Sequence, residues 1–273
     1  MSDGIAKHYG DNANMETAIR EWLVAAGKDL SALTTGDLSS IDEFHIRGRA
    51  ATLELAGKMN LTPAARVLDI GSGLGGPART LAETVGCRVT GVDLTPAFCE
   101  MAAVMSGWVG LDDKVSFRQG DATALPFSDA SFDTAMTIHV TMNIPAKDKV
   151  FSEARRVLKP GGIFAVYDVL QAEGGPPHFP VPWARDPSIS HLATTDEVTG
   201  LLQGAGFSLR ETRDSSDESL AWFREVASAV AARGTPALNA AAFMGKDFPA
   251  MVQNQVANLE ERRIRTVSFI CEA

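Results

Sequence analysis

The chain has 273 residues, of which 45% are hydrophobic and 22% charged, the balance of an ordinary soluble protein that buries a core without disulfides. Its formal net charge of −9 would repel a polyanion, so nucleic-acid partners are disfavoured. Its three cysteines lack paired spacing, which favours a reducing compartment, and we find neither a secretory leader nor an apolar run of about eighteen residues. The sequence therefore predicts a cytoplasmic protein without stable membrane association.

Residues 1–61 show helical periodicity, as around Ile19, Trp22 and Leu23 and again over Ala50 to Met59, but no strand pattern. We expect them to form an N-terminal helical cap.

Residues 62–216 alternate short β-branched runs with helical stretches, the pattern of parallel strands joined by helical crossovers. The expected strands are Arg66 to Ile70, Arg88 to Asp93, Val115 to Arg118, Phe132 to His139, Ile163 to Val169 and Phe207 to Thr212. The expected helices are Pro77 to Val85, Pro96 to Trp108, Lys147 to Leu158 and Thr195 to Ala205. The sequence thus predicts an α/β core with a Rossmann-like arrangement.

Residues 217–262 interrupt this alternation with two further helical patterns, Ser219 to Val230 and Phe248 to Arg262. One last β-rich run, Ile264 to Cys271, follows within residues 263–273. We therefore expect a helical cap insertion ahead of a final strand that returns to the core sheet.

The first expected strand runs into a glycine-rich turn, Gly71-Ser72-Gly73-Leu74-Gly75-Gly76, and then into a helix. Such a turn lets backbone N–H groups approach a ligand, and the helix N-terminus adds partial positive charge. Asp93 ends the next strand twenty residues beyond Gly73, where an acid that binds a ribose is expected. These features suit NAD as well as other nucleoside cofactors, and a turn without a ligand is the structural alternative.

Two more acids separate these alternatives. Asp69 places a carboxylate at the end of the first strand, where it could orient a cationic ligand, whereas a pyrophosphate gains nothing from it. Asp121 ends the third strand and suits an adenine amino group. The acids favour a cationic nucleoside cofactor over NAD.

The segments VLDIGSGLGG, GVDLTP, GDATALPF and RRVLKPGG stand in the order of the successive motifs of one family. In them the chain resembles the class I S-adenosylmethionine-dependent methyltransferases, over about residues 40 to 213. FHIRG, GGPAR and IHVTMN are similar to the branch that methylates small molecules, which includes the glycine, sarcosine and dimethylglycine N-methyltransferases, the phosphoethanolamine N-methyltransferases and the tocopherol C-methyltransferases.

The resemblance implies a seven-stranded mixed sheet with helices on both faces and an antiparallel last strand. It implies S-adenosyl-L-methionine as cofactor and S-adenosyl-L-homocysteine as product. It also implies roles in cofactor binding for Gly71, Ser72, Gly73, Asp93, Leu94, Asp121, Ala122 and His139, to which we add Asp69 and His45.

The acceptor is expected beyond the carboxyl ends of the fourth and fifth strands, near His139 and Asp168. A histidine with a pKa near neutrality suits a general base, with Asp168 as the next candidate. The remaining candidates for substrate binding are Asn143, His178, Trp183 and Arg185. For each residue the structural alternative is a packed or surface position without a ligand.

No His, Cys, Asp or Glu cluster has metal-ligand spacing, and no nucleophile motif occurs in the sequence. Metal and covalent mechanisms are therefore disfavoured, and the resemblance implies methyl transfer by in-line displacement to a small polar acceptor, with an amine nitrogen in first place. The alternatives are an O- or C-methyltransferase of a phenol- or quinol-like metabolite, an NAD-linked oxidoreductase and a non-catalytic S-adenosylmethionine-binding protein.

Overall fold

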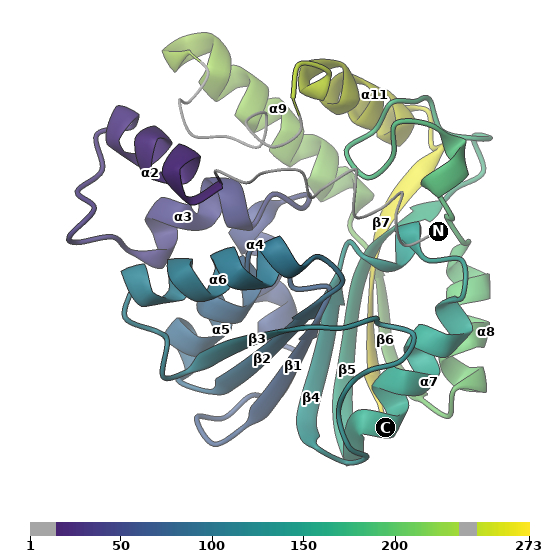
Figure 1. The fold of residues 1–273 in the computed structure, drawn as a ribbon. Coiled ribbons are helices and arrows are strands. Elements are labelled where there is room, and N and C mark those ends of the chain that lie inside the picture. The colour runs from purple at the N-terminus through teal and green to yellow at the C-terminus, as the bar shows by residue number, and fades with distance from the viewer. Residues whose placement is uncertain (1–14, 235–244) are drawn as a thin grey trace.

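The computed structural model describes residues 15–234 and 245–273, which form a seven-stranded sheet with helices on both faces (Figure 1). The strand order is β3-β2-β1-β4-β5-β7-β6. The strands are β1 (Arg66–Ile70), β2 (Arg88–Asp93), β3 (Val115–Gln119), β4 (Phe132–Ile138), β5 (Leu158–Gln171), β6 (Ser208–Asp214) and β7 (Ile264–Glu272). The helices between them are α5 (Gly76–Val85), α6 (Pro96–Trp108), α7 (Lys147–Val157) and α8 (Thr195–Gly204).

Strands β1 to β5 run parallel to one another, and β7 runs antiparallel to both β5 and β6. The predicted Rossmann-like mixed sheet with an antiparallel last strand is confirmed. Because the first five strands share one direction, their carboxyl ends meet at one edge of the sheet, the edge where open α/β sheets hold their ligands.

Two apolar layers enclose the sheet. Leu68 and Ile70 of β1 pack with α7 and α8 on one face, and Val67 packs with α5 and α4 (Gly48–Ala56) on the other. A strand buried on both faces is expected to be apolar throughout. Asp69 breaks this rule at 2% exposure, which marks it as a residue held there for a reason other than packing.

The helices outside this core gather at one end of the sheet. Helices α2 (Met15–Ala25) and α3 (Thr35–Asp42) precede the core with α4, while α9 (Ser216–Arg233) and α11 (Phe248–Glu260) lie between β6 and β7. Figure 1 shows α2, α3, α9 and α11 at the same end of the sheet. Residues 1–14 and 235–244 of the two expected caps lie outside the described residues. Within residues 15–234 and 245–273, no helix is long and apolar enough to cross a membrane.

The structure refines the expected elements. Helix α3 lies within the predicted N-terminal helical cap, for which the sequence pattern set no separate bounds of this helix, and it begins with a capping box between Thr34 and Asp37. Strand β5 begins at Leu158 rather than at Ile163, and its pairing with β4 shifts register between Phe132 and Thr134. The Lys-Pro-Gly-Gly segment thus lies inside the strand, because glycine accommodates the irregular backbone of a register shift.

Candidate active site

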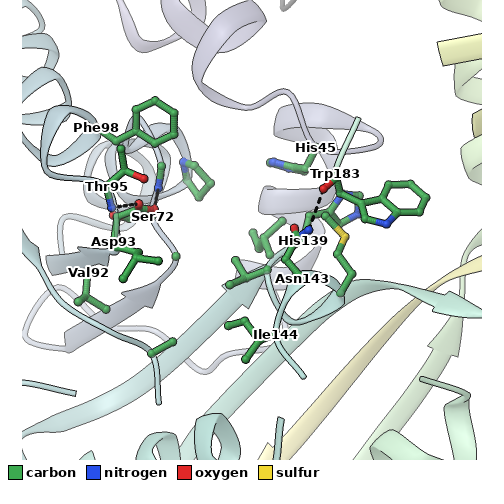
Figure 2. A pocket seen from close by; sticks show the side chains of 18 of the residues that line it. His45, Ser72, Val92, Asp93, Thr95, Phe98, His139, Asn143, Ile144 and Trp183 are labelled. Atoms are coloured by element: carbon green, nitrogen blue, oxygen red, sulfur yellow. Dashed lines mark hydrogen bonds between the residues drawn. The ribbon is translucent and has the colours of Figure 1, made fainter. Parts of the chain in front are cut away.

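A cavity of about 370 Å³ opens at the carboxyl ends of β1, β2 and β4. The turn between β1 and α5, the segment from Phe44 to Ile46 and the segment Pro182–Trp183 contribute to its lining, and Asp42 reaches it beside the turn. Figure 2 shows two groups of side chains, with Ser72, Asp93, Thr95 and Phe98 in one and His45, His139, Asn143 and Trp183 in the other. We call these the nucleoside end and the acceptor end.

The glycine turn leaves open space where a ligand can approach the backbone. Gly73 has a φ of 51°, and a Cβ built on it would meet no protein atom within 4 Å. Gly71 has a φ of 78°, and a Cβ there would lie 2.3 Å from a methyl group of Val140. The left-handed backbone favours glycine at position 73, and at position 71 the lack of space for a Cβ requires it.

Asp93 fixes this turn from the end of β2. Its Oδ2 accepts a hydrogen bond from the Gly73 N–H at 2.8 Å, and its Oδ1 accepts one from the Thr95 N–H at 2.9 Å. Burial raises the pKa of Asp93, and these two N–H donors act against that rise. The carboxylate keeps lone pairs that can accept from ribose hydroxyls.

Asp69 lies beneath the cavity and is not among the residues that line it. Burial raises the pKa of Asp69 to about 8, and the carboxylates of Asp93 and Glu43 contribute to the rise. Within the described residues its Oδ2 and the Ser72 Oγ are buried without a hydrogen-bond partner. A cationic ligand fits this surplus of carboxylates and unpaired polar atoms, and a pyrophosphate does not.

A buried ion pair holds the turn from outside. Asp42 Oδ2 accepts from the Arg79 guanidinium at 2.7 Å, and the two side chains are 2% and 0% exposed. The guanidinium also donates to the carbonyls of Leu74 and Ala102. Neither residue is a site candidate from the sequence, because residues 37 positions apart give no local signal of contact.

Leu94, Asp121 and Ala122 also line the nucleoside end. Asp121 is exposed, and its Oδ1 accepts from the N–H and the hydroxyl of Thr123. These three residues lie where the resemblance implies, and their contacts with an adenine stay a prediction.

His139 and His45 face each other at the acceptor end, with ring centroids 5.9 Å apart. Burial, together with the nearby His45, lowers the pKa of His139 well below its usual value. Burial lowers the pKa of His45 to about 4, although its Nε2 lies 3.0 Å from the Gly48 carbonyl oxygen. Both histidines are therefore neutral at pH 7.

The backbone of His139 is unusual. β4 ends at Ile138 rather than at His139, because His139 has a φ of 53°, a left-handed conformation that few residues other than glycine adopt. The ring packs against Tyr167 with 5.0 Å between centroids, and its Nε2 is buried without a partner in the described part of the chain. Strain and an unpaired polar atom at one residue are typical of functional sites.

Asn143 and Trp183 both line the acceptor end. The Asn143 amide donates to the carbonyls of Trp183 and Ile189 at 2.7 and 2.9 Å, and Trp183 Nε1 donates to the Ser190 hydroxyl at 3.0 Å. Asn143 therefore fixes the loop that carries Trp183, whose indole is 1% exposed.

The structure does not bring Asp168, His178 and Arg185 to the cavity. Asp168 accepts from the Thr141 hydroxyl at 2.5 Å and from two backbone N–H groups, so it holds the turn after β4. His178 lies 2.9 Å from Glu261, and Arg185 binds Asp247 at 2.5 Å. These three side chains bind partners within the protein outside the cavity lining, and their expected roles in catalysis and acceptor binding stay predictions that this lining does not support.

The cavity also contains residues that sequence analysis did not select, among them Phe44, Ile46, Met142 and Gln255. Gln255 lies on α11 four residues after Met251 and four before Leu259, both of which are buried. The sequence signal that could have identified Gln255 is a glutamine within an otherwise apolar stripe of a helix. In the described ranges, no three His, Cys, Asp or Glu side chains gather as a metal site.

Comparisons with known proteins identify relatives among the methyltransferases. A family model described as a methyltransferase domain matches residues 68–166. Methyltransferase GfsG of Streptomyces halstedii is 33% identical over 194 residues, which are 67% of this chain and 67% of that protein. Sterol 24-C-methyltransferase ERG6B of Gibberella zeae is 43% identical over 119 residues, 44% of this chain and 31% of the relative.

The chain spans less than half the length of the sterol methyltransferases that it matches. In its fold it is similar to the geranyl diphosphate C-methyltransferase of Streptomyces coelicolor A3(2), with a TM-score of 0.73 and 15% identity, covering 99% of this chain and 97% of that one. The GfsG match, the family model and the fold agree in one assignment, with S-adenosylmethionine as the cofactor. The chain belongs to the class I S-adenosylmethionine-dependent methyltransferases.

Proposed function

We propose that this enzyme methylates an uncharged, largely apolar small molecule at a hydroxyl oxygen or an electron-rich carbon. One observation carries the proposal: among the described residues that line the cavity, the charged side chains are Asp42, Asp93 and Asp121, and none is a lysine or arginine. Asp42 is paired with Arg79, and the other two belong to the nucleoside end. The acceptor end offers neutral side chains.

A charged acceptor would lose its hydration in such a cavity without gaining a counter-ion. Burial of an unpaired ion costs several kcal/mol or more, so a phosphate or carboxylate group needs a cation that this lining lacks. An ammonium group would need a free carboxylate at the acceptor end. This argues against the amine acceptor that the sequence led us to expect.

His139 suits the proton transfer of such a reaction. Bound S-adenosylmethionine supplies a methyl group on a positively charged sulfur. As the bond to the methyl carbon forms and its bond to sulfur breaks, releasing S-adenosylhomocysteine, an attacking hydroxyl becomes a strongly acidic oxonium, and an attacking alkene becomes a carbocation with acidic C–H bonds. A neutral imidazole with a low pKa can accept the proton from either, whereas it is a weak base toward an ammonium group.

The names of the relatives support a carbon acceptor. Several sterol 24-C-methyltransferases match the chain at 30% identity or more, and by name they methylate a carbon of a neutral, apolar molecule. These relatives match 44% to 63% of this chain, so the particular acceptor is a matter for direct assay.

The test is transfer of a labelled methyl group from S-adenosylmethionine to a panel of acceptors. The neutral arm contains a sterol with an unsaturated side chain, phenols and quinols, and the charged arm contains sarcosine and phosphoethanolamine. We expect turnover in the neutral arm. Turnover confined to the charged arm would overturn the proposal.

A further inference from the structure

Helix α11 carries three buried or partly buried carboxamides on the side that faces the loop from His178 to Trp183. Asn254 donates to the Pro180 carbonyl at 2.9 Å. Asn258 accepts from the His178 N–H at 2.7 Å and donates to the His178 carbonyl at 3.0 Å. These two side chains fasten α11 to the loop that continues to Trp183.

Gln255 differs from its two neighbours on the helix. It is 5% exposed and lines the cavity, and its carboxamide makes no hydrogen bond to any described residue. Its position between Met251 and Leu259 on the buried face directs the side chain inward rather than to solvent.

The Gln255 carboxamide borders the cavity, so its donor and acceptor atoms face a ligand or water rather than a protein group. A few polar groups on the wall of a mostly apolar cavity typically fix the orientation of a ligand. An apolar side chain would also pack at this point of the helix, so packing alone does not account for a glutamine.

The other polar side chains at the acceptor end already have partners within the protein. Asn143 binds two carbonyls, Trp183 binds Ser190, and His45 contacts the Gly48 carbonyl. His139 and Gln255 remain available to an acceptor, one from the end of β4 and one from the helical insertion.

We propose that Gln255 determines acceptor specificity by hydrogen bonding to a hydroxyl or carbonyl oxygen of the acceptor. A carboxamide donates and accepts but carries no charge, so it recognises a neutral polar group on an otherwise apolar molecule. This inference rests on the proposed function, according to which the acceptor is a neutral molecule. The contact itself is tested by binding measurements that need no turnover.

The test compares phenol with toluene, which have nearly the same shape and differ by the hydroxyl group. Nuclear magnetic resonance titrations measure the dissociation constants of both probes for protein saturated with S-adenosylhomocysteine. The variants are Gln255→Leu and Gln255→Ala, with Gln253→Leu as matched control, because Gln253 is exposed on the same helix and does not line the cavity. Melting temperatures and affinity for S-adenosylhomocysteine show whether each variant is folded.

We expect the parent and Gln253→Leu to bind phenol at least tenfold more tightly than toluene, and both Gln255 variants to lose this preference. A parent without the preference, or a Gln255 variant that keeps it, overturns the inference. The acceptor panel is a separate readout. Turnover of charged amines alone would overturn the proposed function and leave the Gln255 contact standing. Turnover of neutral acceptors, together with a phenol preference that the Gln255 variants keep, would support the proposed function and overturn the Gln255 contact.

Discussion

Asp93 has two functions, and removal of its carboxylate abolishes both. Its carboxylate holds the glycine turn through the N–H groups of Gly73 and Thr95, and it lines the nucleoside end of the cavity. We predict that Asp93→Ala weakens binding of S-adenosylhomocysteine at least tenfold, about 1.4 kcal/mol, as measured by calorimetry. Equal affinity of variant and parent would remove the ribose assignment.

Asp69 makes cofactor binding depend on pH. With a pKa raised to about 8, its carboxyl group is mainly protonated at pH 7 in the ligand-free protein. Its raised pKa stabilises the fold fully below pH 3.8, the pKa expected for the unfolded chain, and this contribution is lost as the pH rises through about 8. A nearby cation favours the charged carboxylate, so binding of S-adenosylmethionine releases a proton below about pH 8.

We therefore predict that affinity for S-adenosylmethionine rises between pH 6 and 8. Calorimetry at pH 7 in phosphate and in Tris should show binding enthalpies that differ by the heat of buffer ionisation. In Asp69→Asn the buffer dependence should vanish. A parent enthalpy that is the same in both buffers would contradict the prediction.

His139 is predicted to act on the acceptor rather than on the cofactor. His139→Ala should lower turnover about 10²-fold or more and change affinity for S-adenosylhomocysteine less than twofold, since general-base losses appear in the rate. His178→Ala is the control, because His178 is exposed, lies beside Glu261 and does not line the cavity. Loss of cofactor binding with full turnover at saturation would place His139 in the cofactor pocket.

At the scale of elements, the ion pair between Asp42 and Arg79 joins α3 to α5 beneath the glycine turn. Removing one member leaves a buried, unpaired charge, which typically costs about 3–5 kcal/mol. We predict a loss of this size in the free energy of unfolding of Asp42→Ala, measured with urea.

The exposed pair of Glu16 and Arg20 on α2 is the matched control, with side chains 49% and 41% exposed. Glu16→Ala should change the free energy of unfolding by less than about 1 kcal/mol, because solvent screens a surface pair. A similar effect of both substitutions would show that burial does not set the strength of the inner pair.

At the scale of the whole molecule, two segments far apart in sequence meet over the cavity. Residues 43–47 come from the N-terminal side and α11 from the insertion, and both contribute to the lining through His45 and Gln255. We predict that amide hydrogen exchange slows in both segments when S-adenosylhomocysteine and a neutral probe are bound, because a ligand between them restricts opening.

Helix α8 is the internal reference, since it packs against α7 and β6 away from the cavity. Its exchange should stay unchanged. Unaltered exchange in both cavity segments would argue that they do not close on the ligand.

The nucleoside end was predictable from sequence because its parts are local. A strand, a glycine turn and a helix are consecutive from Arg66 to Val85, and Asp93 lies one crossover away. Backbone geometry dictates the glycines at positions 71 and 73, so residue type alone revealed the turn. The bounds of β1 and β2 followed from the same short-range patterns, whereas the antiparallel direction of the last strand followed from the resemblance to the family.

The acceptor end was decided by tertiary structure. Its lining combines residues 44–46, His139, Trp183 and Gln255, which belong to four separate segments. Sequence identified His139 by its place after β4, but it could not show that Asp168 points into a turn or that Arg185 meets Asp247. Contacts between distant segments depend on how the caps pack over the sheet, and no local pattern encodes that packing.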